Sequence, residues 1–176
     1  MLLESLIDSW KEVRAGLVLE ILLIPADQFA FRATPETRSI TEIIHHIVEA
    51  EKFLIGEVCR PDTNFARLPF KELMKEYASE VKSVEGKDNL VRLLEDSLKS
   101  TEAMLRSFGE DALKEDMLRL DGKTMPKLAF LHFTINHETY HRGQITVYER
   151  LLQIEPEMTA RVNKFLAAQS KESTAS

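Results

Sequence analysis

Residues 131–152 read LHFTINHETYHRGQITVYERLL, and this stretch decides the fold that the sequence predicts. An α-helix turns about 100° per residue, so side chains three or four positions apart lie on one face. His137 and His141 are one turn apart on such a face. They share it with Phe130, Phe133, Gln144, Tyr148, Leu151 and Leu152. The pattern predicts a long helix from about Pro126 to Leu152 that points both imidazoles into a helical core.

Three more long stretches have helical spacing. Residues 2–23 carry one apolar stripe. A second helix is predicted over 39–59, because Ser39 and Glu42 match a capping box, in which each side chain satisfies the other residue's free N–H. A third is predicted over 88–109, where Asp88 can cap the start and a glycine stands at the expected C-terminus. Four long amphipathic helices predict an all-α fold, a four-helix bundle.

The segments around these helices are shorter. Residues 61–85 form a long excursion with one short amphipathic helix, and the Asp-Gly pair at 121–122 is a weak hairpin signal. Pro156 begins a short final helix. We therefore expect one domain over residues 1–168, with short additional helices, and a flexible tail over 169–176.

The composition excludes several classes of function. The chain of 176 residues has a formal charge of −6 and no basic cluster, which argues against nucleic-acid partners and anionic membranes. Cys59 is the only cysteine, so no internal disulfide can form. Glu4 and Asp8 interrupt the N-terminal apolar residues, unlike a secretory signal, and no apolar run approaches the ~18 residues of a membrane span. We expect a soluble cytoplasmic protein.

The other histidines separate by helical phase. His46 flanks the apolar stripe of the second helix and is expected to point inward. His45 falls beside charged residues and is expected in solvent. His132 lies on the far side of the fourth helix from the His137–His141 pair, so we expect it to be exposed or in a subunit contact.

Three inward histidines point to a metal site. Buried imidazoles need partners for both ring nitrogens, and three cationic rings would repel one another. One divalent ion solves both problems, since each neutral ring gives it a lone pair. A His-x-x-x-His pair alone is often accidental, and His46 on a second helix is what favours ligation by His46, His137 and His141. Three imidazoles suit zinc, nickel, copper and iron alike, and leave a coordination position open.

Several other polar residues of the ligand helices carry expectations. Gln144 and Tyr148 lie on the histidine face and need partners, so we expect contact with a ligating histidine or a substrate. Glu138 and Arg142, four residues apart, indicate a helix-surface ion pair. Glu51 is the carboxylate nearest the histidines, and we expect it toward the edge of the apolar face.

Gly143 indicates that another backbone approaches closely on the opposite face of the fourth helix. A glycine inside a helix costs about 1 kcal/mol relative to alanine. Its neighbours on that face, Asn136, Thr139 and Thr146, are small or uncharged. The approaching backbone would belong either to the third helix of the same bundle or to a second subunit.

Two segments also resemble a known family. Residues 131–152 resemble the last core helix of the DinB/YfiT-like superfamily, and TRSITEIIHHIVEAEKFL, residues 37–54, resembles its second helix. The family's ligand positions fall on His46 in HIVEAE and on His137 and His141 in HETYHRGQ. The resemblance implies an up-down-down-up bundle, a three-histidine site often holding nickel or zinc, and a homodimer.

The resemblance leaves three functions open. Some relatives transfer a low-molecular-weight thiol such as bacillithiol, mycothiol or glutathione to a small electrophile, and others are described as metal-dependent hydrolases. The metal would activate the thiol in the first case and a bound water in the second. A hydrolase would benefit from a general base, and the missing inward carboxylate favours the thiol transferase. A non-enzymatic stress-response protein that binds a metal or ligand is the third reading.

Overall fold

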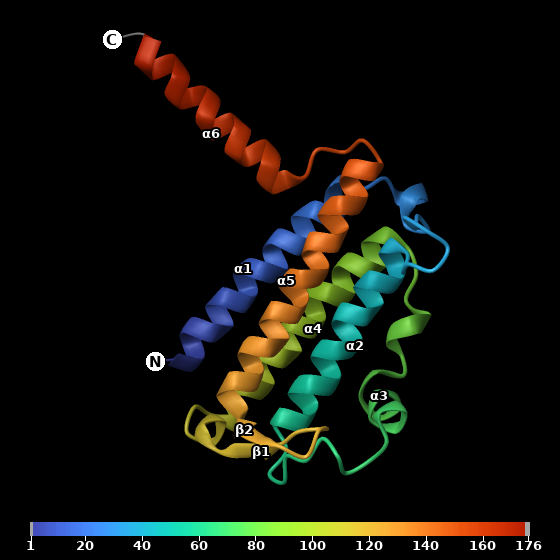
Figure 1. Cartoon of the computed structure of the whole chain (residues 1–176), viewed down its shortest axis with the longest axis vertical. Coiled ribbons are helices and arrows are strands. Elements are labelled where there is room, and N and C mark those ends of the chain that lie inside the picture. Colours follow the sequence, from blue (N-terminus) through green and yellow to red (C-terminus); the bar gives the residue numbers. More distant parts are fainter. Residues whose placement is uncertain (1, 175–176) are drawn as a thin grey trace.

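The computed structural model describes residues 2–174 and sets four long helices side by side (Figure 1). These are α1 (Leu2–Leu23), α2 (Ile40–Val58), α4 (Lys87–Phe108) and α5 (Lys127–Leu151). The shorter elements are η1 (Ala26–Gln28), α3 (Phe70–Ala78), η2 (Val81–Ser83), η3 (Ala112–Lys114), β1 (Asp116–Leu118), β2 (Thr124–Pro126) and α6 (Glu157–Thr174).

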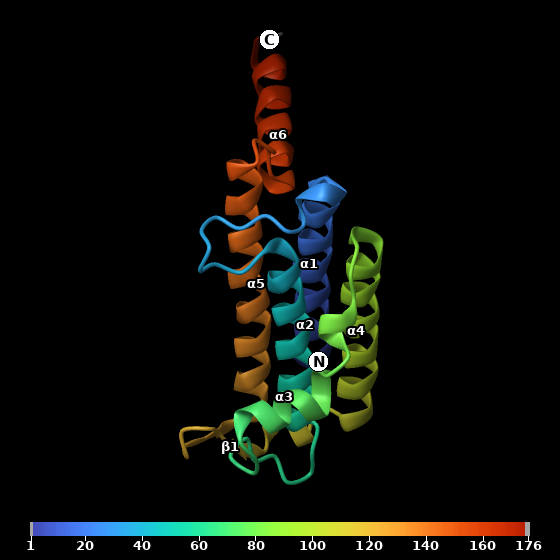
Figure 2. The ribbon, with the colours of Figure 1, turned by 90° about the vertical axis from the view of Figure 1, so that its right-hand side faces the viewer.

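The four long helices form the expected up-down-down-up bundle. In Figures 1 and 2, α1 and α5 run in one direction along the bundle, while α2 and α4 run in the other. Both α1 and α2 pack against α4 and against α5, so α1 and α2 are diagonal partners. The arrangement puts one face of α2 directly against one face of α5.

The helix ends follow the capping signals with one exception. The Ser39 hydroxyl accepts from the Glu42 N–H at 3.2 Å, and the Glu42 carboxylate accepts from the Ser39 N–H at 2.8 Å, which confirms the capping box. Gly109 ends α4 with a φ of 87°. The start of α4 differs, because Gly86 with a φ of 84° precedes it and Asp88 lies in its first turn instead of capping it.

A buried ion-pair network joins the helices. The Arg14 guanidinium on α1 lies 2.6 Å from a Glu138 oxygen on α5 and 2.8 Å from a Glu51 oxygen on α2. Trp10 Nε1 donates to Glu138 at 2.7 Å, and Thr101 on α4 donates to Glu51 at 2.7 Å. Each charge has partners on other helices, as a buried ion requires.

This network corrects two expectations. Glu138 is buried and bound to Arg14, so it forms no surface pair with Arg142, which instead contacts Glu20 on α1 at 2.9 Å. Glu51 is fully buried and not at the edge of the apolar face. Spacing within one helix could not reveal that the partner of both carboxylates is an arginine within the apolar stripe of α1.

His45 is also not in solvent. Its side chain is buried, and its Nε2 lies 2.8 Å from the Val84 carbonyl oxygen. The excursion between α2 and α4 folds back over this face of α2, so a helix face that looks charged in the sequence is covered. The expectation of a solvated His45 was wrong for that reason.

The excursion and the hairpin gather at one end of the bundle. The predicted short helix is α3, which packs against α2. The Asp-Gly signal is confirmed, because β1 and β2 pair antiparallel with Met117 opposite Met125. The Phe65 N–H donates to the Leu118 carbonyl at 2.9 Å and fastens the excursion to the hairpin. In Figure 1 the hairpin and the first part of the excursion lie at the lower end of the bundle, and the chain after α3 rises beside α2 to the start of α4.

The last helix is longer than expected. α6 has 18 residues and projects beyond the end of the bundle, as Figures 1 and 2 show. Residues 169–174 of the expected tail continue this helix, and 175–176 lie outside the described residues. Within residues 2–174, none of the helices combines the length and apolar character that crossing a bilayer needs.

Candidate metal centre

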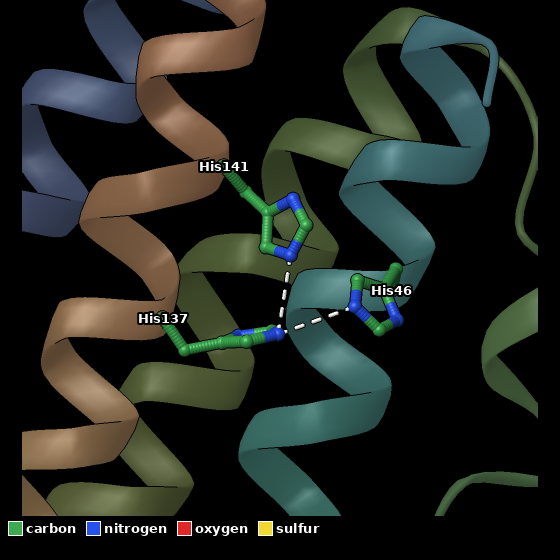
Figure 3. A group of neighbouring side chains, drawn as sticks. All are labelled: His46, His137 and His141. Carbon is green, nitrogen blue, oxygen red and sulfur yellow. Dashed lines mark hydrogen bonds between the residues drawn. The ribbon is translucent and has the colours of Figure 1, made fainter. Parts of the chain in front are cut away.

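Three histidines from two helices converge inside the bundle. His46 stands on α2, while His137 and His141 are one turn apart on α5, and the packing of α2 against α5 turns the rings toward one another (Figure 3). His141 is buried and the other two rings are half-buried. The structure thus brings together the three residues that helical phase had selected.

The spacing of their nitrogens fits one ion. The Nε2 atoms of His46 and His137 are 3.2 Å apart, and those of His137 and His141 are 3.1 Å apart. The three candidate ligand atoms all lie within 4.8 Å of one another. Two nitrogens bound tetrahedrally to one ion at about 2.0–2.1 Å would be about 3.3 Å apart. The residues therefore fit a divalent metal with little movement, and three ligands leave a position open.

The surroundings keep the imidazoles neutral. Burial first, and then the nearby positive charge of Arg38 and of the other rings, lower the pKa of His46 and of His137 to about 4. The pKa of His141 is also lowered, chiefly by burial. Neutral rings offer the lone pairs that a metal requires.

Gln144 and Tyr148 have different partners. Gln144 Oε1 lies 2.8 Å from Nδ1 of His141. An N–H on Nδ1 that donates to this oxygen leaves the lone pair on Nε2, facing the other two rings. The Tyr148 hydroxyl donates instead to the Arg38 carbonyl oxygen at 2.9 Å. Gln144 thus orients a histidine of the cluster, and Tyr148 fixes the backbone just before α2.

The cluster opens onto a cavity of about 660 Å³. His46 and His137 line it, together with residues of α2, α3, the hairpin and α5. Its walls are mostly apolar and include five phenylalanines: Phe53, Phe65, Phe70, Phe130 and Phe133. A cavity of this size and character suits a small organic molecule.

Among the described residues that line this cavity, no carboxylate is free of an ion pair. The cavity has two acidic side chains, Glu49 and Asp121. Glu49 lies 3.4 Å from Lys82, and Asp121 lies 3.2 Å from Arg119. The only group of three or more possible metal ligands in residues 2–174 is the three-histidine cluster. The site is therefore rich in neutral imidazole and poor in general bases.

The remaining candidates lie away from the site. His132 is exposed, which agrees with one of the two expectations for it. Burial raises the pKa of Cys59 to about 11, so its thiol stays protonated at neutral pH and is a poor nucleophile. Gly143 is exposed, and a Cβ built there would meet nothing within 4 Å. Packing against another helix of the same chain, one of the two explanations for this glycine, is therefore wrong.

Sequence reasoning missed the cavity. Arg38 was not singled out, although it lines the cavity beside His46. The role of the 61–85 excursion was unassigned, and it supplies Phe65, Phe70 and Met74 to the cavity walls. The amphipathic pattern of 70–78 was the available signal, because an apolar face on a short surface helix has to be buried against something.

The comparisons agree with this fold. The DinB family profile matches residues 2–172, and the chain belongs to the DinB family. YfiT from Bacillus subtilis, described as a probable metal-dependent hydrolase with an unusual four-helix bundle topology, has a TM-score of 0.67 at 16% identity, over 87% of this chain and 89% of its own. A DinB-like protein of the same species, YjoA, has a TM-score of 0.64 at 19% identity, over 85% and 92%.

A third similar structure is a mycothiol-dependent maleylpyruvate isomerase. Its TM-score is 0.64 at 18% identity, and the match covers 81% of this chain but only 60% of that one. At such identities the likeness shows the shared fold alone. A comparison with curated proteins found no match.

Proposed function

We propose that this protein is a metal-dependent enzyme that activates a low-molecular-weight thiol for attack on a small electrophile. The observation that carries the proposal is the set of three neutral imidazoles, with Nε2 atoms 3.1–3.2 Å apart along the chain of contacts, at the wall of a mostly apolar cavity. We propose His46, His137 and His141 as the ligands of one divalent ion, zinc or nickel first and iron or copper as alternatives.

A bound ion would lower the pKa of a thiol in the open position, so that it is a thiolate at neutral pH. The residues of the chain orient the ligating histidine and bind the electrophile. Gln144 holds the His141 ring in its ligating tautomer, and the apolar walls hold the electrophile and exclude water. The sulfur lone pair forms the new C–S bond, the leaving group departs with its bonding pair, and the thiol proton goes to solvent.

The acid–base inventory separates this reaction from hydrolysis. Hydrolysis by a metal-bound water benefits from a positioned general base or acid, whereas a thiolate formed at the metal attacks without one. Both cavity carboxylates, Glu49 and Asp121, already form ion pairs with Lys82 and Arg119. Glu51 is bound to Arg14 inside the bundle. The site therefore suits thiol activation better than water activation.

A metal-dependent hydrolase is the second candidate, and the fold shared with YfiT is what favours it. A non-enzymatic metal-binding or ligand-binding role in a stress response is the third. Because the cavity is large enough for an organic molecule, we place the enzyme readings first. We also propose a homodimer, with the exposed face around Gly143 as the contact.

The test is a conjugation screen run on one metal-loaded preparation. Glutathione, bacillithiol and mycothiol are each offered with 1-chloro-2,4-dinitrobenzene, and p-nitrophenyl acetate is offered with no thiol. We expect conjugation that requires the metal and is lost in His137→Ala, but not in His132→Ala. Ester hydrolysis that requires the metal, with no conjugation by any thiol, would replace the proposal with the hydrolase. Activity in neither arm would favour the non-enzymatic role.

A further inference from the structure

The charged residues of the cavity do not balance. Four cationic and two acidic side chains line it, although the whole chain carries a formal charge of −6. Both acids are neutralised inside the cavity, Glu49 by Lys82 at 3.4 Å and Asp121 by Arg119 at 3.2 Å. The excess charge therefore belongs to the two remaining cations.

Those cations are Arg38 and Lys71. No carboxylate of the described residues forms an ion pair with either, and their side chains are exposed at the cavity. Arg38 lines the cavity together with His46 and His137, and it also lines a second, adjoining hollow together with His46. Lys71 stands at the start of α3. Of the two, Arg38 alone borders His46 in both hollows, so it is the cation placed beside the histidine cluster.

The backbone at Arg38 is held in place. Its carbonyl oxygen accepts the Tyr148 hydroxyl at 2.9 Å, and the next residue, Ser39, is fixed in the capping box with Glu42. Tyr148 itself is buried with its ring edge-on to Phe31, at a centroid distance of 5.6 Å. The guanidinium therefore extends from a rigid point, which lowers the entropy that binding a ligand costs.

The other residues that line the cavity indicate the size and polarity of the ligand. Phenylalanines from α2, the excursion and α5 line it. Phe53 packs edge-on against Phe65 at 5.2 Å between ring centroids, and Phe65 packs at a tilt against Phe130 at 4.8 Å. Such walls bind an apolar or aromatic group and cannot satisfy a charge. An anion on the ligand needs a separate partner at the rim.

We propose that Arg38 is the anion-binding, specificity-determining residue of this cavity, and that its ligand is a small apolar or aromatic molecule that carries a carboxylate. The inference rests on the proposed function in one respect, because it names this ligand as the electrophile. A guanidinium offers two parallel N–H groups to a carboxylate, which an ammonium cannot do. The carboxylate would sit on Arg38 while the apolar body fills the cavity beside the histidines.

The test compares two compounds of nearly one shape, 4-phenylbutyrate and 4-phenylbutyramide, by NMR titration of the metal-free and zinc-loaded protein. We expect the wild type to bind the acid about tenfold more tightly than the amide, in both forms. Arg38→Gln should bind the two equally, at the affinity of the amide. Arg38→Lys should keep part of the preference. Arg92→Gln, an exposed arginine of α4 outside the cavity, should keep all of it.

Several results would overturn the inference. Equal binding of acid and amide by the wild type would do so, as would the absence of binding by either at millimolar concentration. A preference present only with zinc would place the carboxylate on the metal, and one lost in Lys71→Gln but not in Arg38→Gln would place it on Lys71.

The source of the anion is tested with a second pair, N-acetylcysteine and its amide. If Arg38→Gln weakens the thiol acid and leaves phenylbutyrate unchanged, the carboxylate belongs to the thiol and the assignment to the electrophile fails. Failure of the conjugation screen alone leaves the Arg38 result standing, because the titration needs neither metal nor turnover.

Discussion

Nδ1 of His141 lies 2.8 Å from Oε1 of Gln144, three residues further along α5. The contact directs Nε2 of the same ring toward His137. Partners of this kind hold a ligating histidine in one tautomer, and their loss commonly weakens metal affinity 10–100-fold. Gln144→Ala should therefore weaken metal binding about tenfold, measured by competition with a chromophoric chelator. Gln144→Glu keeps an acceptor and should retain affinity. Unchanged affinity in Gln144→Ala would show that the contact does not orient the ring.

Acid should release the metal and also destabilise the metal-free protein. The folded-state pKa of His46 and of His137 is about 4, below the ordinary value of 6.5. Between these pH values the unfolded chain binds more protons than the folded one, so stability falls as the pH falls. Protons also compete with the ion for the same lone pairs.

We expect metal loss by equilibrium dialysis as the pH drops below about 6.5, and a falling Tm of the metal-free protein over the same range. His132→Ala should give the same curves, because His132 is exposed. Full occupancy at about pH 3 would be incompatible with imidazole ligation.

Glu149 should limit stability on the alkaline side. Its side chain is buried, and neither carboxylate oxygen has a hydrogen-bond partner among the described residues. Burial, with the charge of Glu20, raises the pKa of Glu149 from 4.5 to about 8. The folded state therefore holds a proton that the unfolded state releases, so stability declines as the pH rises toward 8.

Glu149→Gln replaces the protonated carboxyl with a neutral amide of similar shape. It should raise the Tm at pH 8 and flatten the decline between about pH 6 and pH 8, with a gain on the order of 1 kcal/mol. Glu95→Gln on the exposed face of α4 is the matched control and should change little. A Tm of Glu149→Gln that falls as steeply as the wild type's would contradict the assignment.

The exposed face of α5 at Gly143 should carry the dimer contact. A Cβ there meets nothing within 4 Å of the same chain, so the bundle has room for a larger side chain. Gly143→Leu should weaken self-association while leaving metal stoichiometry unchanged, as measured by light scattering at micromolar concentration. A wild-type monomer with metal bound would rule out the dimer. Loss of metal and dimer together would contradict the assignment of Gly143 to an open face of the bundle.

Helical phase was sufficient to find the histidine cluster. His46, His137 and His141 each lie at or beside an apolar stripe, and a four-helix bundle turns such stripes inward. The capping box at Ser39 and the glycine at 109 set helix ends for the same reason, since both act through neighbours in the chain. Local chemistry was enough for these features.

The helical phase of a residue could not predict its contacts with segments that are distant in the sequence. His45 and Glu138 stand among polar neighbours in the sequence, yet one is covered by the excursion at Val84 and the other is bound to Arg14. The cavity depends on α3 and the hairpin meeting the same end of α2 and α5. No pattern within any one of these segments specifies that contact between segments. The sequence alone therefore did not indicate that Arg38 lines a cavity beside His46.

Metal content is the most direct test of the three-histidine site. The protein is purified without added metal and its content is measured by inductively coupled plasma mass spectrometry, before and after incubation with zinc or nickel and removal of the excess. We expect close to one divalent ion per chain in the wild type and in His132→Ala, and none in His46→Ala, His137→Ala or His141→Ala, with each variant's folding checked by circular dichroism. A folded wild type that retains no ion after incubation, or a folded His137→Ala that retains a full equivalent, would contradict the site.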